Sequence, residues 1–345
     1  MTAKRVLLGA TAAFSLPNSS GPPLLLDLTR HNLVTGELVC RPSARNKSPY
    51  VGDVRVEERT AICHLPSMDM GGKARPGVQI VMKPALDRKG QPVGPDAVSA
   101  KYGTPKCEFI GQLIHCVERD NEATGGCFIG AHPTLGEELA EALVTQGLLG
   151  MPDAVVSYQR EVKDIAGVGS RADFVLEHAS GRRSVLEVKT VVDTDSSPSA
   201  EQLVSNPKKS VFISADSPYK RAAIFPWGRA AQKGPDNEKV VSARAIKHLD
   251  ELAALASRER LDEAGNELDA TVLFIVTRSD AVAFRPNHEA CPSFARHLKR
   301  AEAAGVRVLV RRITWGEGAN MGKAFDGGSL PLVWLPGVGG EETKH

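Results

Sequence analysis

The feature that most constrains the fold of this chain is a pair of charged residues inside an apolar segment. Ser184–Val192 has the composition of a buried strand, yet it contains Glu187 and Lys189. Side chains alternate between the two faces of an extended chain, so these two point to one side and their apolar neighbours to the other. Burying a carboxylate and an ammonium carries a large desolvation penalty unless they pair or bind an ion. The fold must therefore supply a partner for both charges.

The segment before this strand adds a second carboxylate. Arg171–Leu176 is a short apolar run that contains Asp173, and Ala179–Arg182 between the two runs is rich in turn residues. Two strand-like runs joined by such a turn predict a β-hairpin. We expect the carboxylates of Asp173 and Glu187 to converge in this hairpin.

A divalent cation would account for these charges. Asp173 and Glu187 would supply hard oxygen ligands of the type that Mg²⁺ or Mn²⁺ takes, joined by the Val188 carbonyl and water. Lys189 would orient or deprotonate the attacking water and, with the metal, stabilise the charge that develops on a phosphodiester. Glu161 in the preceding segment is a further candidate carboxylate. The alternative is an ordinary strand with an exposed Glu/Lys ladder, because this spacing often occurs by chance.

The N-terminal half consists of short strands separated by Gly and Pro, a pattern that predicts a small barrel of the OB type. The expected strands are Leu24–Leu28, Glu37–Cys40, Tyr50–Val54, Val78–Met82 and Gly111–His115. A helix is expected over Pro133–Leu143, where leucines recur at helical spacing and Thr134 is placed to cap the N-terminus.

The C-terminal half alternates strands and helices, which predicts an α/β domain. An apolar stripe predicts a long helix over Lys239–Ala256, and the continuous apolar run Thr271–Val276 suits a buried central strand. A further helix containing Phe294 and Leu298 ends near Gly305, and a last strand follows.

The length of 345 residues predicts two domains. We place a tail or targeting segment at 1–23, the OB-like domain at 24–132 and the α/β domain at 133–338, with a long loop or insertion near 196–235 that is rich in Ser, Pro, Lys and Gly. The first acidic residue is Asp27, and the preceding basic and apolar residues resemble a transit peptide or a short signal. The alternative is a frayed tail that enters an edge strand.

Composition narrows the class of protein. A hydrophobic share of 42% and a charged share of 24% are typical of globular proteins, and a net charge of +2 is too small to identify a polyanionic partner. No uncharged apolar segment reaches the roughly 18 residues needed to span a bilayer. We therefore expect a cytoplasmic or organellar protein that is not integral to a membrane. The six cysteines include no CxxC pair, which favours a reducing compartment.

Two groups of residues are candidates for nucleic-acid binding. Arg45, Lys47 and Tyr50 in the barrel offer phosphate-pairing charge and one stacking ring, as single-strand binders use, although a solvated basic face is the alternative. Arg244 and Lys247, with His248, lie within about one helical turn and would clamp phosphate near the metal, or would form a solvated helix face.

A zinc site is the other metal hypothesis. The histidines and cysteines of the barrel half suggest it, but they lack paired ligand spacing, and buried thiols and hydrogen-bonded histidines are the ordinary case. The residues concerned are His64, His115, His132, Cys63, Cys107, Cys116 and Cys127.

Taken together, the motifs resemble those of the sugar fermentation stimulation protein (SfsA) family, over most of residues 37–335. In the C-terminal half the resemblance is carried by Ser170–Phe174, Leu186–Val191, Ala243–Leu249, Phe274–Val276 with Arg278 and Asp280, Phe284–Pro286, Ala301–Val306 and Leu330–Leu332. The N-terminal half is less close and matches in Arg45–Val51, Cys63–Pro66 and Phe128–Gly130.

The resemblance implies an OB-like N-terminal domain, a PD-(D/E)XK nuclease-like C-terminal domain and DNA binding. Asp173, Glu187 and Lys189 match the nuclease motif. The charged positions beside it are matched by Glu161, Arg171, Arg244, Lys247 and His248. The chain departs from the family where Ser67–Met70 precedes Gly71-Gly72 and where Ala245 replaces an expected Gly, and its loop before the long helix is longer than usual.

Two classes of function remain at this point. One is a Mg²⁺- or Mn²⁺-dependent nuclease that acts on DNA rather than RNA; the other is a non-catalytic DNA-binding or regulatory protein that retains the nuclease fold. The intact set of Asp173, Glu187 and Lys189 favours the nuclease. The chain contains no GxGxxG, Walker-type loop or GxSxG that would support a small-molecule enzyme. The sequence leaves homo-oligomer formation open.

Overall fold

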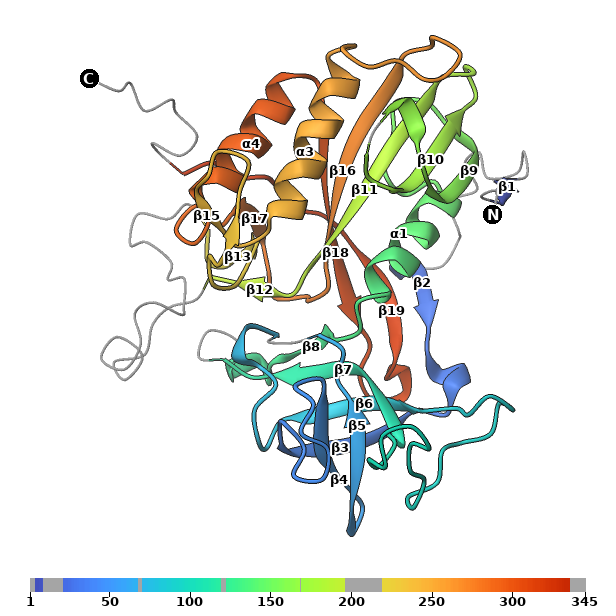
Figure 1. Ribbon diagram of the computed structural model, residues 1–345, viewed down its shortest axis with the longest axis vertical. Helices are drawn as coiled ribbons and strands as arrows, with labels where there is room; N and C mark the ends of the chain where they lie inside the picture. Colours follow the sequence, from blue (N-terminus) through green and yellow to red (C-terminus); the bar gives the residue numbers. More distant parts are fainter. Residues whose placement is uncertain are drawn as a thin grey trace.

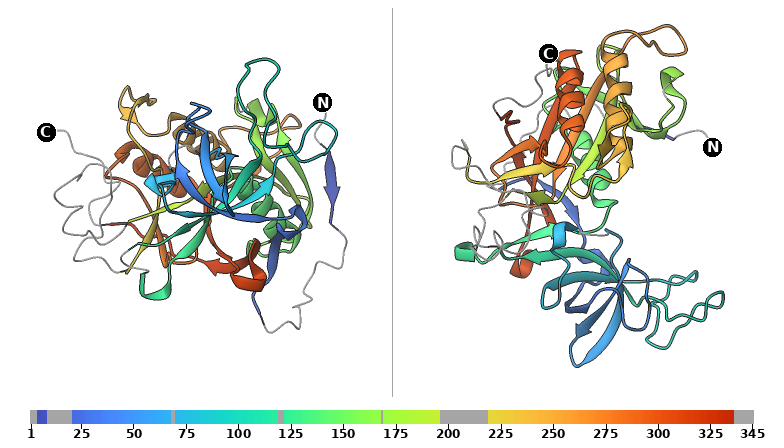
Figure 2. Two further views of the ribbon diagram at one scale, coloured as in Figure 1. Left: turned by 90° about the horizontal axis from the view of Figure 1, so that it is seen from below. Right: turned by 60° about the vertical axis from the view of Figure 1, so that its left-hand side comes forward.

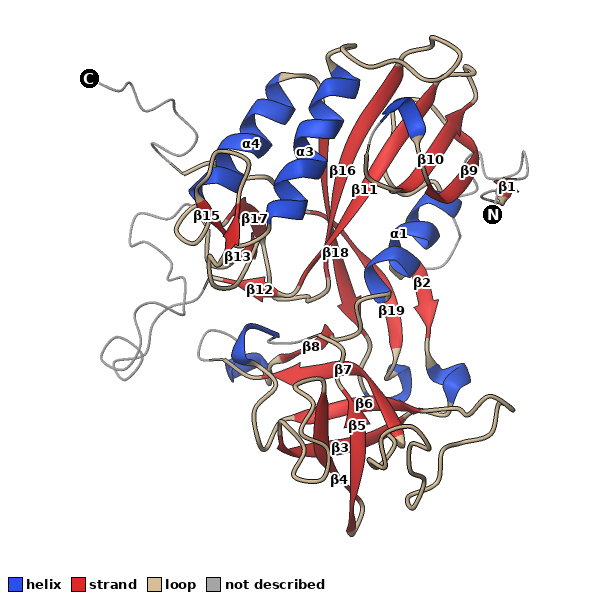
Figure 3. Cartoon of the chain, viewed as in Figure 1, coloured by secondary structure: helices blue, strands red, loops and turns tan. Residues whose placement is uncertain are grey.

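The computed structural model describes residues 4–8, 21–67, 70–118, 122–167, 169–195 and 219–335. These residues form a small β-barrel and a larger α/β body, which lie one above the other in Figure 1. Most of the expected N-terminal tail, and residues 196–218 of the expected long loop, lie outside the described residues. Figure 3 shows that strands dominate both parts and that the α-helices belong to the larger body.

The barrel is built from consecutive strands of the N-terminal half. The strands are β3 (Val34–Cys40), β4 (Val51–Val56), β5 (Arg59–His64), β6 (Gln79–Pro84), β7 (Phe109–Cys116) and β8 (Cys127–Gly130). They follow the order β5-β4-β3-β6-β7-β8, and a further pairing of β5 with β7 closes the barrel. Leu38, Val54 and Ile80 are fully buried in its interior. The expected OB-like barrel is therefore present.

The strand expected over Leu24–Leu28 belongs to the large sheet and not to the barrel, so this prediction is wrong. β2 (Leu24–Asp27) pairs antiparallel with β19 (Lys323–Ser329) at the edge of the large sheet, and Leu25 and Leu28 are buried in that core. A short apolar run specifies that a strand forms, but it does not specify which distant strand pairs with it. The barrel begins at β3.

The larger body is organised around an eight-stranded sheet of order β1-β9-β10-β11-β16-β18-β19-β2. Its remaining strands are β1 (Arg5–Leu7), β9 (Val155–Val162), β10 (Ala172–His178), β11 (Arg183–Val191), β16 (Leu268–Val276) and β18 (Arg307–Trp315). β10 and β11 form the expected antiparallel hairpin, while β11, β16 and β18 run parallel. The pairing of β1 with β9 agrees with the edge-strand interpretation of the N-terminus.

Helices cover both faces of this sheet. α1 (Leu135–Thr145) packs on one face, and α3 (Ala243–Ala256) with α4 (Pro292–Ala303) packs on the other (Figure 1). α3 begins later than expected, at Ala243, where Ser242 caps the helix by accepting a hydrogen bond from the Ala245 amide. None of the helices in the described residues is both long and apolar enough to cross a bilayer.

Shorter elements complete the body. The small strands are β12 (Asp193–Thr194), β13 (Ala222–Phe225), β14 (Gln232–Lys233), β15 (Lys239–Val240) and β17 (Ala283–Pro286). β12, β13 and β17 form a three-stranded sheet, and β14 pairs with β15 in the segment where the long helix was expected to begin. The 3₁₀ turns are Thr29–His31, Met70–Gly72, Glu122–Thr124, Ile165–Gly167 and Gly318–Asn320.

The barrel and the α/β body meet in the right-hand view of Figure 2, and ion pairs join residues of the two parts. This junction cluster consists of Lys73, Glu118, Asp193, Arg221, Arg278 and Asp280. The buried Arg278 guanidinium donates to the Glu118 carboxylate at 2.8 Å and to Asp280 at 2.6 Å, and Lys73 pairs with Asp193. Burial works to raise the pKa of Glu118, but Arg278, Lys73 and Arg221 outweigh it and hold that pKa at about 2.

Candidate active site

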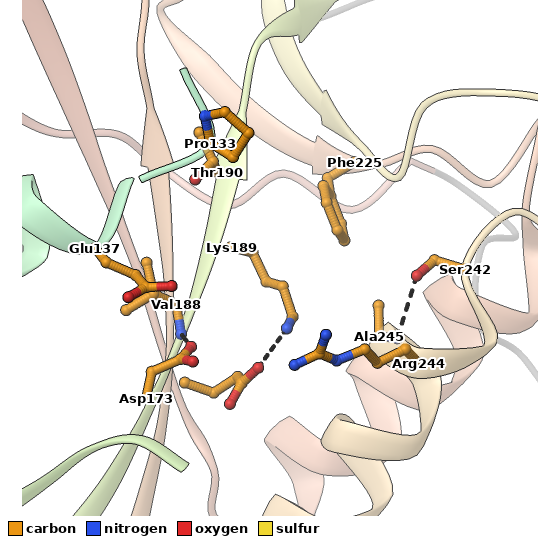
Figure 4. A pocket seen from close by; sticks show the side chains of 11 residues that line it. Pro133, Glu137, Asp173, Val188, Lys189, Thr190, Phe225, Ser242, Arg244 and Ala245 are labelled. Atoms are coloured by element: carbon orange, nitrogen blue, oxygen red, sulfur yellow. Dashed lines mark hydrogen bonds and ion pairs between the residues drawn. The ribbon is translucent and has the colours of Figure 1, made fainter. Parts of the chain in front are cut away.

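The β10–β11 hairpin positions the first two candidate residues. Phe174 pairs with Leu186 in the antiparallel register, so Asp173 and Glu187 lie on neighbouring strands and on the same sheet face. The Asp173 carboxylate accepts a hydrogen bond of 2.7 Å from the Val188 amide. This face is the one covered by α3 (Figure 4).

Glu187 sits at the centre of a polar network beneath α3. The Lys189 ammonium and the Nδ1 atom of His248 both donate to the same oxygen of Glu187. Arg244 Nε donates to His248 Nε2 at 3.3 Å, which leaves Nδ1 to carry the imidazole proton. Burial alone would raise the pKa of Glu187, but the hydrogen bond from His248 and the charge of Lys189 lower it. Glu187 is therefore held as an anion.

Asp173 has the opposite electrostatic setting. Burial and the negative charge of Glu187 raise its pKa to about 6, against the opposing effects of the Val188 amide and Lys189. Two buried carboxylates on adjacent strands repel each other when both are ionised. Asp173 therefore lacks the positive charge that its neighbour has, and a bound cation would supply it.

The two carboxylates open onto a cavity of about 240 Å³. Its lining residues are Pro133, Glu137, Asp173, Glu187, Val188, Lys189, Thr190, Phe225, Ser242, Arg244 and Ala245. Figure 4 shows the Lys189 and Arg244 side chains extending toward the same space from β11 and α3. The carboxylates of Asp173 and Glu187 and the cationic side chains of Lys189 and Arg244 thus line the same cavity.

Glu137 on α1 is a third carboxylate at this cavity, and sequence reasoning did not single it out. Its negative charge adds to the effects that raise the pKa of Asp173. Arg160 on β9 holds it through an ion pair of 2.9 Å. An acidic residue in the first turn of a helix is common because it complements the helix dipole, so nothing in the local sequence distinguishes Glu137.

The other predicted residues of the α/β body lie at or beyond the rim. Glu161 and Arg171 pair with each other at 3.1 Å, are about half exposed and do not line the cavity. Lys247 points outward, is 59% exposed and lies 3.6 Å from Glu251. His248 is buried behind Glu187, so its position favours orienting Glu187 over contacting phosphate directly.

The predicted barrel residues form a separate surface. Arg45, Lys47 and Tyr50 are exposed on the loop between β3 and β4. Arg45 lies 3.8 Å from Asp53 and donates to the Thr60 carbonyl at 3.2 Å. None of the three lines the cavity around Asp173.

The structure does not support the zinc hypothesis. Within the described ranges, no three His, Cys, Asp or Glu side chains are grouped so that they could hold a metal ion. Cys116 and Cys127 are register partners on β7 and β8, and burial raises their pKa values to about 11 and about 12. Zinc binds the thiolate, so this environment disfavours it. By the same criterion, Asp173 and Glu187 form a two-carboxylate site that water would have to complete.

Comparisons with known proteins agree with one another. A sequence model described as "Sugar fermentation stimulation protein RE domain" matches residues 235–318. A sugar fermentation stimulation protein homolog from Thioalkalivibrio sulfidiphilus is 30% identical over 267 residues, which cover 77% of this chain and 84% of that protein. Homologs from Ruegeria sp. and Maricaulis maris are 29% and 33% identical and cover 76% and 53% of this chain and 84% and 59% of their own lengths.

A solved structure is similar in fold. It is titled "The structure of Pyrococcus Furiosus SfsA in complex with Ca2+" and superposes with a TM-score of 0.57, at 18% identity, over 90% of this chain and 100% of that one. At this level of identity the likeness concerns the fold.

Proposed function

Because this chain belongs to the sugar fermentation stimulation protein family, we propose that its Asp173–Glu187 site binds a divalent cation and hydrolyses phosphodiester bonds in DNA. The observation that carries the proposal is the convergence of Asp173, Glu187 and Lys189 at one cavity, with Arg244 beside them. The arrangement combines anionic ligands for a metal with cationic groups for a phosphate, which is the combination that phosphodiester hydrolysis requires.

The donor set fits a hard cation such as Mg²⁺ or Mn²⁺. Carboxylate oxygens are the ligands that such ions take, usually together with several waters. The raised pKa of Asp173 marks a carboxylate that a nearby positive charge would return to its ionised form. The solved relative titled as a Ca²⁺ complex adds support, since Ca²⁺ also takes oxygen ligands.

The residues of the chain have distinct roles in this proposal. A bound cation would polarise the phosphate and lower the pKa of its water. Lys189 lies beside the Glu187 carboxylate, where its ammonium can orient the attacking water and stabilise charge on the non-bridging oxygens. Arg244 extends a guanidinium into the cavity, where it can pair with a phosphate oxygen. His248 holds Glu187 in orientation from behind.

A second function is favoured by a different observation. One oxygen of Glu187 is already engaged by both Lys189 and His248, and Asp173 and Glu187 form only a two-carboxylate set. Internal neutralisation of this kind suits a protein that binds DNA and retains the nuclease fold as a platform. Both proposed functions use Arg244 and the exposed basic residues to bind DNA. Only an assay of DNA cleavage therefore distinguishes the nuclease from the binding protein.

The test is cleavage by the purified protein in Mg²⁺, Mn²⁺ or EDTA, on single-stranded DNA, double-stranded DNA and RNA. The matched pair is Asp173→Asn and Asp164→Asn, because Asp164 is exposed and does not line the cavity. We expect metal-dependent cleavage of DNA by the wild type and Asp164→Asn, and none by Asp173→Asn. Binding to DNA, measured by fluorescence anisotropy in EDTA, should be unchanged or tighter in Asp173→Asn because a carboxylate charge near phosphate is removed.

The outcomes separate the two functions. Binding by all three proteins without cleavage would establish the platform function and reject the nuclease. Equal cleavage by wild type and Asp173→Asn would point to a contaminating nuclease and would also reject the catalytic site. Calorimetric titration with Mn²⁺ adds a readout independent of turnover, in which wild type should bind the ion and Asp173→Asn should bind it more weakly.

A further inference from the structure

We propose that a second cavity, on the face of the large sheet opposite to Asp173, binds a phosphate group. The cavity has a volume of about 200 Å³, far more than the roughly 30 Å³ that one water occupies in the liquid. The residues that matter for its chemistry are His178, Arg182, Ser184, Asp269, Thr271 and Arg307. The proposal uses no residue of the proposed nuclease site.

The position of the cavity follows from strand alternation. Ser184 is an odd number of residues from Glu187 on β11, so its side chain points to the α1 face, where Leu186 and Val188 are buried. α1 packs on the other end of this face, with Gly136 against Thr190. The cavity lies at the uncovered end, where β11, β16 and β18 begin.

Polar residues at this end replace the apolar residues found along the rest of the face. Leu176, Leu186 and Leu273 are fully buried in the α1-side core. One step toward the cavity, the buried residues are instead Ser184 and Thr271. Burying a polar group without a hydrogen-bond partner costs free energy. We therefore expect these polar residues either to pair with one another or to bind a ligand.

Part of the polar lining is satisfied internally. His178 Nδ1 donates to the Asp153 carbonyl at 3.1 Å, because a carbonyl oxygen accepts and does not donate. His178 Nε2 therefore accepts from the Ser184 hydroxyl at 2.7 Å. Both side chains are buried and held in one orientation, so they form a rigid floor.

The acceptors at the cavity are also satisfied. The Asp269 carboxylate accepts from Arg182 at 2.6 Å and from Arg258 at 3.4 Å. The Asp153 carboxylate accepts from the amide and hydroxyl of Ser180. Asp269 is thus paired with two arginines, and the Asp153 carboxylate is oriented by Ser180.

Two side chains at this cavity that can donate hydrogen bonds have no partner among the described residues. Across the described parts of the chain, the Thr271 hydroxyl makes no hydrogen bond and the Arg307 guanidinium makes no ion pair. The two residues are register partners on β16 and β18, so their side chains lie side by side on the cavity face. A guanidinium next to a free hydroxyl matches the acceptor oxygens of a phosphate group. The source would be free phosphate or the terminal phosphate of a nucleic acid.

The experiment measures binding of inorganic phosphate to the full chain by calorimetry, against chloride at equal ionic strength. The variants are Arg307→Ala and Thr271→Val, and Arg88→Ala removes the same charge from an exposed position on the barrel loop after β6. We expect Arg307→Ala to weaken binding at least about tenfold. Thr271→Val should weaken it by a smaller factor, Thr271→Ser should restore it, and Arg88→Ala should match the wild type.

A second arm distinguishes the sources. A DNA oligonucleotide with a 5′-phosphate is compared with the same oligonucleotide without it, in wild type and in Arg307→Ala, with EDTA present to prevent cleavage. A preference for the phosphorylated end that disappears in Arg307→Ala would assign the site to nucleic-acid termini, while binding of inorganic phosphate alone would assign it to free phosphate. Absence of both kinds of binding, or binding that Arg307→Ala leaves unchanged, would overturn the proposal.

Discussion

The junction cluster and the Asp173–Glu187 cavity both bury charged residues, and their charges are balanced differently. In the junction cluster, the carboxylates of Glu118, Asp193 and Asp280 meet the cations of Lys73, Arg221 and Arg278. At the cavity, Lys189 and His248 both donate to Glu187, and Arg160 pairs with Glu137. Among the described residues, Asp173 accepts its hydrogen bond from a backbone amide.

The pKa values follow this difference. The pKa of Glu118 falls to about 2 although burial opposes it, whereas the pKa of Asp173 rises to about 6. A buried carboxylate with a full set of cations stabilises the fold at neutral pH, and one without them destabilises it. Both carboxylates are buried, so it is the deficit of positive charge at Asp173 that marks the site that a cation would bind.

The largest expected effect is at the junction cluster. Arg278→Met removes a fully buried cation and leaves Glu118 and Asp280 without their main partner. Breaking one side of a buried ion pair costs about 3–5 kcal/mol, so the free energy of unfolding should fall by that amount. Urea unfolding followed by tryptophan fluorescence measures it, because Trp315 donates to the carbonyl of Thr277, next to Arg278.

The control for this prediction is Arg55→Met, which breaks an exposed pair with Glu37 and should cost less than about 1 kcal/mol. The difference in the free energy of unfolding between wild type and Arg278→Met should also depend on pH. Because the pKa of Glu118 is lower in the folded than in the unfolded protein, its ionised form stabilises the fold at pH values above about 4.5. This contribution is lost as pH falls from about 4.5 toward 2, so the difference in unfolding free energy between the two proteins should shrink over that range. Equal costs for the two variants would show that the junction charges are solvated and would remove the contrast.

A smaller effect of opposite sign is expected at the cavity. In EDTA, Asp173→Asn should raise the free energy of unfolding by about 3 kcal/mol at pH 7.5, because a native pKa raised from 3.8 to about 6 makes ionised Asp173 unfavourable. The raised pKa means that the native state loses stability as pH increases from about 4 to about 6, so the gain should vanish at pH 4. Urea titrations at the two pH values measure it.

Metal provides the complementary measurement. Mg²⁺ should stabilise the wild type and not Asp173→Asn, because a ligand that binds only the native state adds to its stability. Asp164→Asn, at an exposed position, should behave as the wild type does. If Asp173→Asn were less stable than wild type at pH 7.5 without metal, the cavity would not be short of positive charge.

Local patterns in the sequence predicted the barrel, the hairpin and the convergence of Asp173 with Glu187. Alternation fixes which side chains share a face, and turn residues fix which strands are adjacent. Such rules do not reach partners that are far apart in sequence. The pairing of β2 with β19 and the contact of Glu118 with Arg278 join segments that lie far apart in the sequence, and no local pattern specifies them.

The roles on α3 were predicted only in part. Helical spacing placed Arg244 and His248 on one side, and the structure joins them by a hydrogen bond. Helical spacing alone does not show that His248 lies behind Glu187 while Lys247 points to solvent, because that depends on how α3 is rotated against the sheet. Glu137 was missed for a related reason, since only the packing of α1 on β11 brings it to the cavity.

The smallest expected effect concerns Lys247, an exposed charge on the helix that contributes the buried His248. The Lys247 side chain, which pairs with Glu251, is 59% exposed. Lys247→Gln should therefore change the free energy of unfolding by less than about 0.5 kcal/mol. If the proposed DNA binding uses this face, Lys247→Gln should bind DNA more weakly, and by the same factor for every sequence.

The salt dependence of binding gives the number of phosphate contacts. The magnitude of the slope of log affinity against log salt should decrease by about 0.9, the value for one lost phosphate contact on duplex DNA. Anisotropy titrations at several salt concentrations measure this, with Lys89→Gln on the exposed barrel loop as the control. An unchanged slope would exclude Lys247 from the DNA contact, and a large loss of stability would show that its charge is structural, like those of the junction cluster.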